Sequence, residues 1–201
     1  MENQSLNLLD DAIHLPNHPQ NKRKNNPELL KHNLLIAAKT LMLEDGIANL
    51  SMQKVATLAG TSKGGLFHHF KNKDVLIASV FELFIAQVNT AILDEIKRLG
   101  ESKGVFTRAY VNVFFGNADI GLASDWTGLI RAMNAESKLV LLWTDWLNHK
   151  LKAYAHTDDD VRLMSIRHAV DGAWLNDLSD DEMPKIHAYL NTLIDDITIK
   201  A

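Results

Sequence analysis

The side chains best suited to chemistry in this sequence lie in one C-terminal segment. His168 and Asp171 are three residues apart and Trp174 is three further on, so all three share one face of a helix. Such a pair can act as a general acid and base, hydrogen-bond a ligand, or fix helix geometry as a buried pair. No serine or cysteine nucleophile, phosphate-binding loop or metal-ligand spacing accompanies it. We therefore predict that the chain is not an enzyme.

Two other clusters resemble metal sites but have unsuitable geometry. His68 and His69 are adjacent, and adjacent side chains on a helix point about 100° apart, which is poor for joint coordination. Asp158, Asp159 and Asp160 lack the further oxygen ligands and the glycine of a calcium loop. We expect these aspartates to cap the helix that follows them. The chain has no cysteine, which excludes a disulfide and a thiolate metal site. We predict no metal and no cofactor.

A third polar cluster opens a short helical pattern that ends at about His69. It comprises Thr61, Ser62, Lys63 and Gly64. A helix N-terminus offers free backbone N–H groups and a positive dipole end, both of which suit phosphate oxygens. Ser51 is a good N-cap for another short helix, 52–59, directly before this one. Two short helices joined by a glycine-containing turn predict a helix-turn-helix, which places its second helix in the major groove of DNA.

The charge distribution agrees with contact between this region and a polyanion. The 201 residues carry 21 Lys and Arg against 25 Asp and Glu, a net charge of −4. Residues 22–73 carry nine bases and three acids, a net +6, whereas residues 74–201 carry −7. One basic module beside an acidic remainder is typical of a chain in which only one part meets nucleic acid.

The remaining pattern predicts an all-α protein of about nine helices without strands. Apolar residues recur at helical spacing from residue 28 to Gly46 and from Val75 to Leu99. Further helices are predicted over 104–116, 122–134, 136–155, 158–177 and 184–199. Residues 1–27 show no periodicity, and we expect a disordered arm whose basic end either follows the minor groove or makes no contact. A composition of 46% apolar residues, without a signal peptide or a long apolar span, predicts a soluble, cytoplasmic protein with no membrane partner.

With these helices placed, residues 28–85 resemble the DNA-binding region of TetR-family transcriptional regulators. The resemblance is carried by the runs LLIAA from Leu34, SMQKVA from Ser51, AGTSKGGLFHHF from Ala59 and KNKDVL from Lys71. It implies that residues 28–74 form a DNA-binding domain and residues 75–201 a helical effector-binding and dimerisation domain.

The resemblance also assigns roles to single residues. It implies that Ser51 touches phosphate, that Gln53 reaches phosphate or base edges, and that Lys73 contacts the DNA backbone from the start of the fourth helix. The recognition helix begins with Thr61, Ser62, Lys63 and Gly64. Of the two adjacent histidines, we expect one to pack and the other, His68, to face DNA.

Three positions depart from the family pattern. Phe67 stands where the family commonly has a tyrosine whose hydroxyl hydrogen-bonds a phosphate. Thr61 replaces a usual valine, and Gly65 replaces a threonine or serine. We expect Phe67 to weaken backbone positioning by about 1 kcal/mol, the value of one hydrogen bond.

The resemblance further implies that the C-terminal part binds a small effector and forms a homodimer. Candidate effector-binding residues are Phe81, Phe84, Tyr110, Phe114, Trp126, Met133, Trp143, Trp146, His168, Asp171 and Trp174. The aromatic residues either surround a pocket or form a closed core. The last two predicted helices match those that form the family's dimer, with a stripe at Ile186, Leu190, Leu193 and Ile197.

These expectations combine into one functional hypothesis. The chain is predicted to bind double-stranded DNA as a repressor at a pseudo-palindromic operator and to leave it when a small amphipathic or aromatic effector tilts the fourth helix. An activator of the same fold would have the same sequence features. An interaction protein that kept the fold without DNA binding is a third alternative, against which Lys63 and Lys73 speak.

Overall fold

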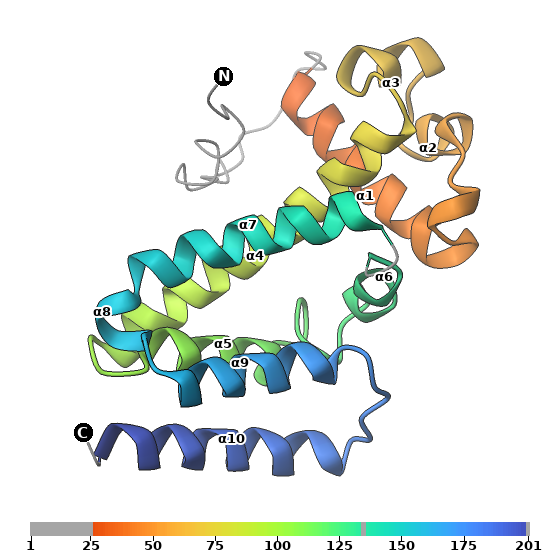
Figure 1. Ribbon diagram of the computed structural model, residues 1–201. Coiled ribbons are helices and arrows are strands. Elements are labelled where there is room, and N and C mark those ends of the chain that lie inside the picture. Colours follow the sequence, from red (N-terminus) through yellow and green to blue (C-terminus); the bar gives the residue numbers. More distant parts are fainter. Residues whose placement is uncertain (1–25, 134–135, 200–201) are drawn as a thin grey trace, which may run out of the picture.

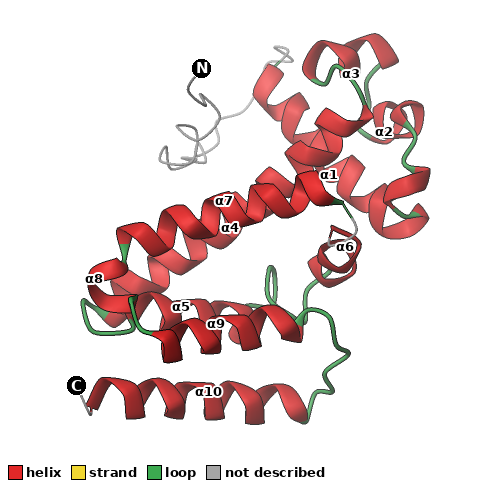
Figure 2. Cartoon of the chain, viewed as in Figure 1, coloured by secondary structure: helices red, strands yellow, loops and turns green. Residues whose placement is uncertain are grey.

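The computed structural model describes residues 26–133 and 136–199. Within these ranges it is all-α without a strand, as predicted, and it contains ten α-helices, where about nine were expected, and one short 3₁₀ helix (Figure 2). The helices of the first part are α1 (Pro27–Asp45), the 3₁₀ helix (Ile47–Asn49), α2 (Met52–Leu58), α3 (Lys63–His69) and α4 (Lys73–Leu99). Those of the second are α5 (Val105–Gly116), α6 (Trp126–Met133), α7 (Ser137–Ala153), α8 (Ala155–Asp158), α9 (Val161–Ala173) and α10 (Glu182–Ile199). Residues 1–25 of the expected N-terminal arm lie outside the described residues.

The first three α-helices form a small unit at one end of the molecule (Figure 1). Its core consists of apolar side chains that are at most 1% exposed, namely Leu34, Ala38, Val55, Ala56, Leu66 and Phe70. The predicted caps are present: Ser51 Oγ accepts from Lys54 N at 3.4 Å, and Ser62 Oγ accepts from Gly65 N at 3.1 Å. Short polar side chains at these two positions therefore set where α2 and α3 begin.

The long helix α4 joins this unit to the rest of the chain (Figure 1). Its 27 residues span about 40 Å at 1.5 Å per residue. It packs against α1 near its start and against α5 and α7 farther along. By length and composition α4 could cross a membrane, but half of its most apolar window is buried inside this protein, which is typical of a core helix.

The segment before α6 is a turn rather than the helical start predicted at residue 122. Asn117 Oδ1 accepts from the backbone N–H groups of Asp119 and Ile120, at 2.9 and 3.2 Å. A Cβ at Gly121 would lie 2.4 Å from the carbonyl oxygen of Asn117, so this turn requires glycine. The helix predicted over 122–134 therefore begins only at Trp126.

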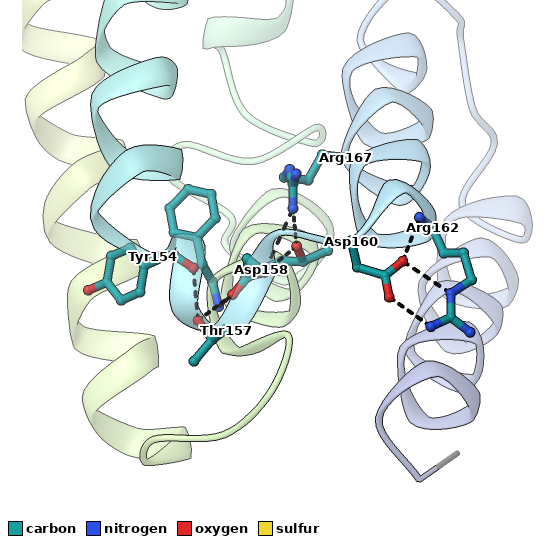
Figure 3. Close-up of polar contacts among 8 residues, drawn as sticks. Tyr154, Thr157, Asp158, Asp160, Arg162 and Arg167 are labelled. Carbon is teal, nitrogen blue, oxygen red and sulfur yellow. Dashed lines mark hydrogen bonds and ion pairs between the residues drawn. The ribbon is translucent and has the colours of Figure 1, made fainter. Parts of the chain in front are cut away.

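The three aspartates 158–160 were expected to cap the helix that follows them, but two of them bond to different helices (Figure 3). Only Asp160 caps the helix that follows, accepting from Arg162 N at 2.8 Å. Asp158 is 2% exposed and turns to α5, where it accepts from the backbone N–H groups of Phe106 and Thr107 at 3.1 and 2.8 Å. The predicted helix over 136–155 ends at Ala153, and the one over 158–177 begins only at Val161, since α8 lies between them.

A buried cation completes this arrangement. Arg167 of α9 is 5% exposed and donates to Thr107 Oγ1 at 2.5 Å, with its guanidinium 3.7 Å from Asp158. Burial lowers the pKa of Arg167, and the nearby carboxylate opposes that shift. Helices α5, α8 and α9 are thus joined by buried polar contacts.

The last helices are arranged around α5. It packs against α4, α9 and α10, and its residues from Val105 to Phe114 are nearly all buried. Helices α9 and α10 run antiparallel beside it, with α10 at the outer edge of the molecule (Figure 1). One side of the pair therefore packs on α5 while the other side faces outward.

Candidate functional site

The helix-turn-helix has the predicted geometry. Thr61 N donates to Ala56 O at 2.9 Å, and Gly60 between them has a φ of 71°, a left-handed conformation that favours glycine. Leu66 of α3 is buried against α2, so the opposite face of α3 points outward. That outward face consists of Lys63, Gly64, Phe67 and His68, all of which are exposed.

The other residues expected to contact DNA flank this face. Gln53 of α2 and Ser62 before α3 are exposed, whereas Ser51 and Thr61 are half-buried. Lys54 is also exposed, but its ammonium is 2.8 Å from Asp45 at the end of α1. The hydrogen bond that its ammonium donates to the Asp45 carboxylate raises the pKa of Lys54. Lys54 therefore links α1 to α2 in the free protein.

Lys73, at the first turn of α4, is half-buried and makes a contact that the sequence did not indicate. Its ammonium donates to the carbonyl oxygen of Ala48 at 2.6 Å. Ala48 lies in the 3₁₀ helix between α1 and α2. The start of α4 is therefore bound directly to the segment that leads into the helix-turn-helix.

The predicted effector-binding aromatic residues gather in one cluster formed by α4, α5, α6, α7 and α9. Its rings are those of Phe84, Tyr110, Phe114, Trp126, Trp143, Trp146 and Trp174. Adjacent centroids lie 4.6 Å apart for Tyr110 and Phe114, and 4.9 Å apart for Phe84 and Trp126. Phe81 is fully buried on α4, and the side chain of Met133 lies outside the described residues.

The polar residues expected beside these rings separate. Asp171 lies against the cluster and accepts a hydrogen bond from the Tyr110 hydroxyl. Burial raises the pKa of Asp171, and burial together with that carboxylate raises the pKa of Tyr110. His168 is exposed on α9, so it does not form a buried pair with Asp171 and does not join the aromatic cluster. Although His168 and Asp171 are less than one helical turn apart, Asp171 faces the interior and His168 faces solvent. Helical spacing in the sequence does not show this difference.

Two contacts of α6 were missed because they join residues far apart in sequence. The Lys39 ammonium of α1 lies 4.3 Å from the centroid of the Trp126 ring, a cation–π contact. At the other end of α6, Arg131 donates to the carbonyl oxygens of Trp174 and Asn176, both at 2.8 Å. Helix α6 therefore connects the unit of α1 to α3 with the end of α9.

The stripe expected at a dimer interface is divided between the interior and the surface. Leu190 and Ile197 are 5% and 6% exposed, while Ile186 and Leu193 are half-buried. Between α9 and α10 lies an open groove of about 440 Å³, lined by Arg162, Ser165, Ile166, Ala169, Leu190, Leu193, Asp196 and Ile197. On the same two helices, Met164 of α9 and Tyr189 of α10 are 43% and 63% exposed.

Comparison with known proteins agrees with this architecture. Residues 34–80 match the family model for bacterial regulatory proteins of the tetR family, and residues 104–195 match the tetracyclin repressor-like C-terminal domain. Among curated proteins, the HTH-type transcriptional regulator AcrR of Shigella flexneri is 25% identical over 93 residues, which cover 46% of this chain and 43% of that relative. The chain thus aligns with less than half of that protein.

Solved structures share the fold across most of the chain. A transcriptional regulator from Pseudomonas aeruginosa PAO1 aligns with a TM-score of 0.68 and 16% identity, covering 88% of this chain and 93% of that one. The multidrug binding protein EbrR complexed with malachite green aligns with a TM-score of 0.63 and 19% identity, covering 81% and 96%. With the tetR model on the helix-turn-helix and the repressor-like model on the C-terminal helices, this chain belongs to the TetR family of DNA-binding transcriptional regulators.

Proposed function

We propose that this regulator is a homodimeric repressor that leaves a pseudo-palindromic operator when a small amphipathic or aromatic effector enters the aromatic cluster. The observation that carries the proposal is the course of α4. Its middle contributes Phe84 to the cluster, and its first residue, Lys73, is bound to Ala48 beside the helix-turn-helix. A single rigid helix therefore touches both the place proposed for the effector and the DNA-binding unit.

The proposed coupling follows from this geometry. An effector between the rings displaces Phe84, because packed aromatic side chains cannot make room without moving their helices. The displacement tilts α4 and shifts α1, α2 and α3 through Lys73. Because a dimer must match two half-sites at once, a changed spacing of the recognition helices lowers operator affinity.

Small aromatic molecules are the proposed effectors because of the chemistry of the cluster. Most of its surface is ring carbon, and Asp171 and the Tyr110 hydroxyl supply a polar edge. Such a combination suits a flat apolar molecule with one polar or cationic group. The structure of EbrR with malachite green, a protein of the same fold, supports this class.

Helices α9 and α10 are the proposed dimer surface. They carry the groove lined by Leu190, Leu193 and Ile197, and each has an exposed apolar side chain, Met164 on α9 and Tyr189 on α10. Apolar side chains around a groove favour burial against a second copy of the same surface. A two-fold axis there would present two α3 helices about one DNA turn, or about 34 Å, apart.

Titration of DNA at two salt concentrations tests the proposal. Purified protein is mixed with labelled fragments from upstream of its own and neighbouring genes, and affinity is measured at low and high salt. We expect binding that weakens steeply with salt, because phosphate contacts release counterions. No binding at low salt, or binding without salt dependence, would contradict operator recognition. Release of the bound fragment by small aromatic dyes, but not by aliphatic acids of similar size, is expected for the effector class.

A further inference from the structure

The outward face of α3 carries few side chains. Of its four residues, Gly64 has none, so only Lys63, Phe67 and His68 extend from the helix. Gly65, beside this face, is also bare. The backbone of the first turn of α3 can therefore approach base pairs more closely than a helix with larger residues there.

The bare position at Gly65 is linked to another departure from the family pattern. A Cβ at Gly65 would lie 2.5 Å from Thr61 Oγ1. The Thr61 side chain thus fills the space that a side chain at position 65 would need. With threonine at position 61, position 65 carries no side chain that could contact a base. The remaining side chains of α3 must therefore distinguish the bases.

Phe67 is the one apolar group among these side chains. Its ring is 40% exposed, although Phe70, three residues later, is only 1% exposed and belongs to the core. Lys63, one turn before, places its ammonium 5.8 Å from the centroid of the Phe67 ring, so the two side chains lie on the same face. A single exposed phenylalanine is unremarkable on an ordinary surface, but this one projects from the helix that enters the groove.

We propose that Phe67 reads the C5-methyl group of a thymine in each operator half-site. That methyl is the one apolar group that the four bases display in the major groove, and phenylalanine is among the side chains that contact it. Phe67 lacks a hydroxyl with which to bind a phosphate, so its ring is free to pack on the methyl. This role of Phe67 rests on the proposed operator binding and adds to it the recognition of a particular base.

The test removes the methyl and the ring separately. Duplexes that bind the full-length protein are selected from a random-sequence pool, and each thymine of a selected duplex is then replaced by deoxyuridine, which lacks only the methyl. In each half-site we expect one thymine to be sensitive, and replacing that single thymine is expected to weaken binding of the natural protein about fourfold. This factor corresponds to about 0.8 kcal/mol for one buried methylene-sized group. In Phe67→Ala the same replacement is expected to have no effect.

Two further variants separate a specific role from a loss of structure. Phe67→Leu keeps an apolar side chain and is expected to retain part of the thymine preference. Leu141→Ala removes a 59% exposed apolar side chain from α7 and is expected to keep the full fourfold effect. If Phe67→Ala responds to deoxyuridine as strongly as the natural protein, or if no thymine is sensitive, Phe67 does not read a methyl. If no duplex is selected, or binding does not depend on salt, the proposed operator binding itself fails.

Discussion

The largest loss of stability from a single polar substitution is expected at Asp158. Its carboxylate accepts from Phe106 N, Thr107 N, Thr107 Oγ1 and Thr157 Oγ1, at 3.1, 2.8, 2.5 and 2.8 Å. Two of these donors are N–H groups at the start of α5, whose own N-cap is Gly104 and supplies no side-chain acceptor. Asp158→Ala leaves the N–H groups of Phe106 and Thr107 without their side-chain acceptor and removes the carboxylate that lies 3.7 Å from the buried guanidinium of Arg167 (Figure 3). Breaking a buried charge pair by removing one partner costs about 3–5 kcal/mol.

Thermal and urea unfolding measure this loss, at a fixed protein concentration because the proposed dimer would make apparent stability depend on concentration. For a chain of this size, 3–5 kcal/mol corresponds to a decrease in Tm of about 6–20 °C. Asp158→Asn keeps one acceptor oxygen and is expected to lose less. The double variant Asp158→Ala, Arg167→Met is expected to regain part of the loss, since it removes the unpaired buried cation.

The neighbouring aspartates provide matched controls. Asp159 is exposed, and Asp159→Ala is expected to change the free energy of unfolding by no more than about 0.5 kcal/mol. Asp160→Ala removes the N-cap of α9 and is expected to cost less than Asp158→Ala. Equal losses from Asp158→Ala and Asp159→Ala would refute the role of the buried cap. A double variant Asp158→Ala, Arg167→Met that is less stable than Asp158→Ala alone would refute it as well.

Three further outcomes are expected elsewhere. Lys73→Ala should weaken binding of selected and random DNA by the same factor and make the salt dependence shallower, as for a phosphate contact, whereas a purely sequence-selective loss would contradict that role. Lys39→Met should lower the free energy of unfolding by about 0.5–2 kcal/mol through loss of the contact with Trp126, while Lys31→Met, at an exposed site on the same helix, should leave it unchanged. Because the folded-state pKa of Asp171 is raised, its ionisation opposes folding, so the stability of the natural protein relative to Asp171→Asn should fall as the pH rises above about 4 and level off above the folded-state pKa. Urea unfolding of both proteins across pH checks this. A natural protein that gains stability relative to Asp171→Asn as the pH rises would contradict it.

The features that could be predicted from the sequence depend on neighbouring residues. Ser51 and Ser62 begin α2 and α3 because a short polar side chain reaches an N–H group three residues on. The helix-turn-helix was identified from such local signals together with its family motif. The exposed face of α3 follows from the same helical periodicity.

The features that were missed depend on partners far along the chain. Asp158 was expected to cap the helix that follows it, but the fold places its carboxylate beside the start of α5, about fifty positions earlier. His168 shares a helical register with Asp171, yet it faces solvent because neighbouring helices cover only one side of α9. The contact between Lys39 and Trp126 likewise depends on how α1 meets α6. Periodicity gives the direction of a side chain on its helix but not the element that it meets.

The cap that Asp158 provides for α5 has a consequence for how the chain is made. The ribosome releases residues in order, so the N–H groups of Phe106 and Thr107 emerge about fifty residues before the carboxylate that satisfies them. The contacts of α1 with α2 and of α2 with α3 span far shorter stretches of sequence and can close during synthesis. We therefore expect the DNA-binding unit to become protease-resistant on the ribosome while α5 is still open. The C-terminal helices complete this buried cap only when α8 and α9 have been synthesised.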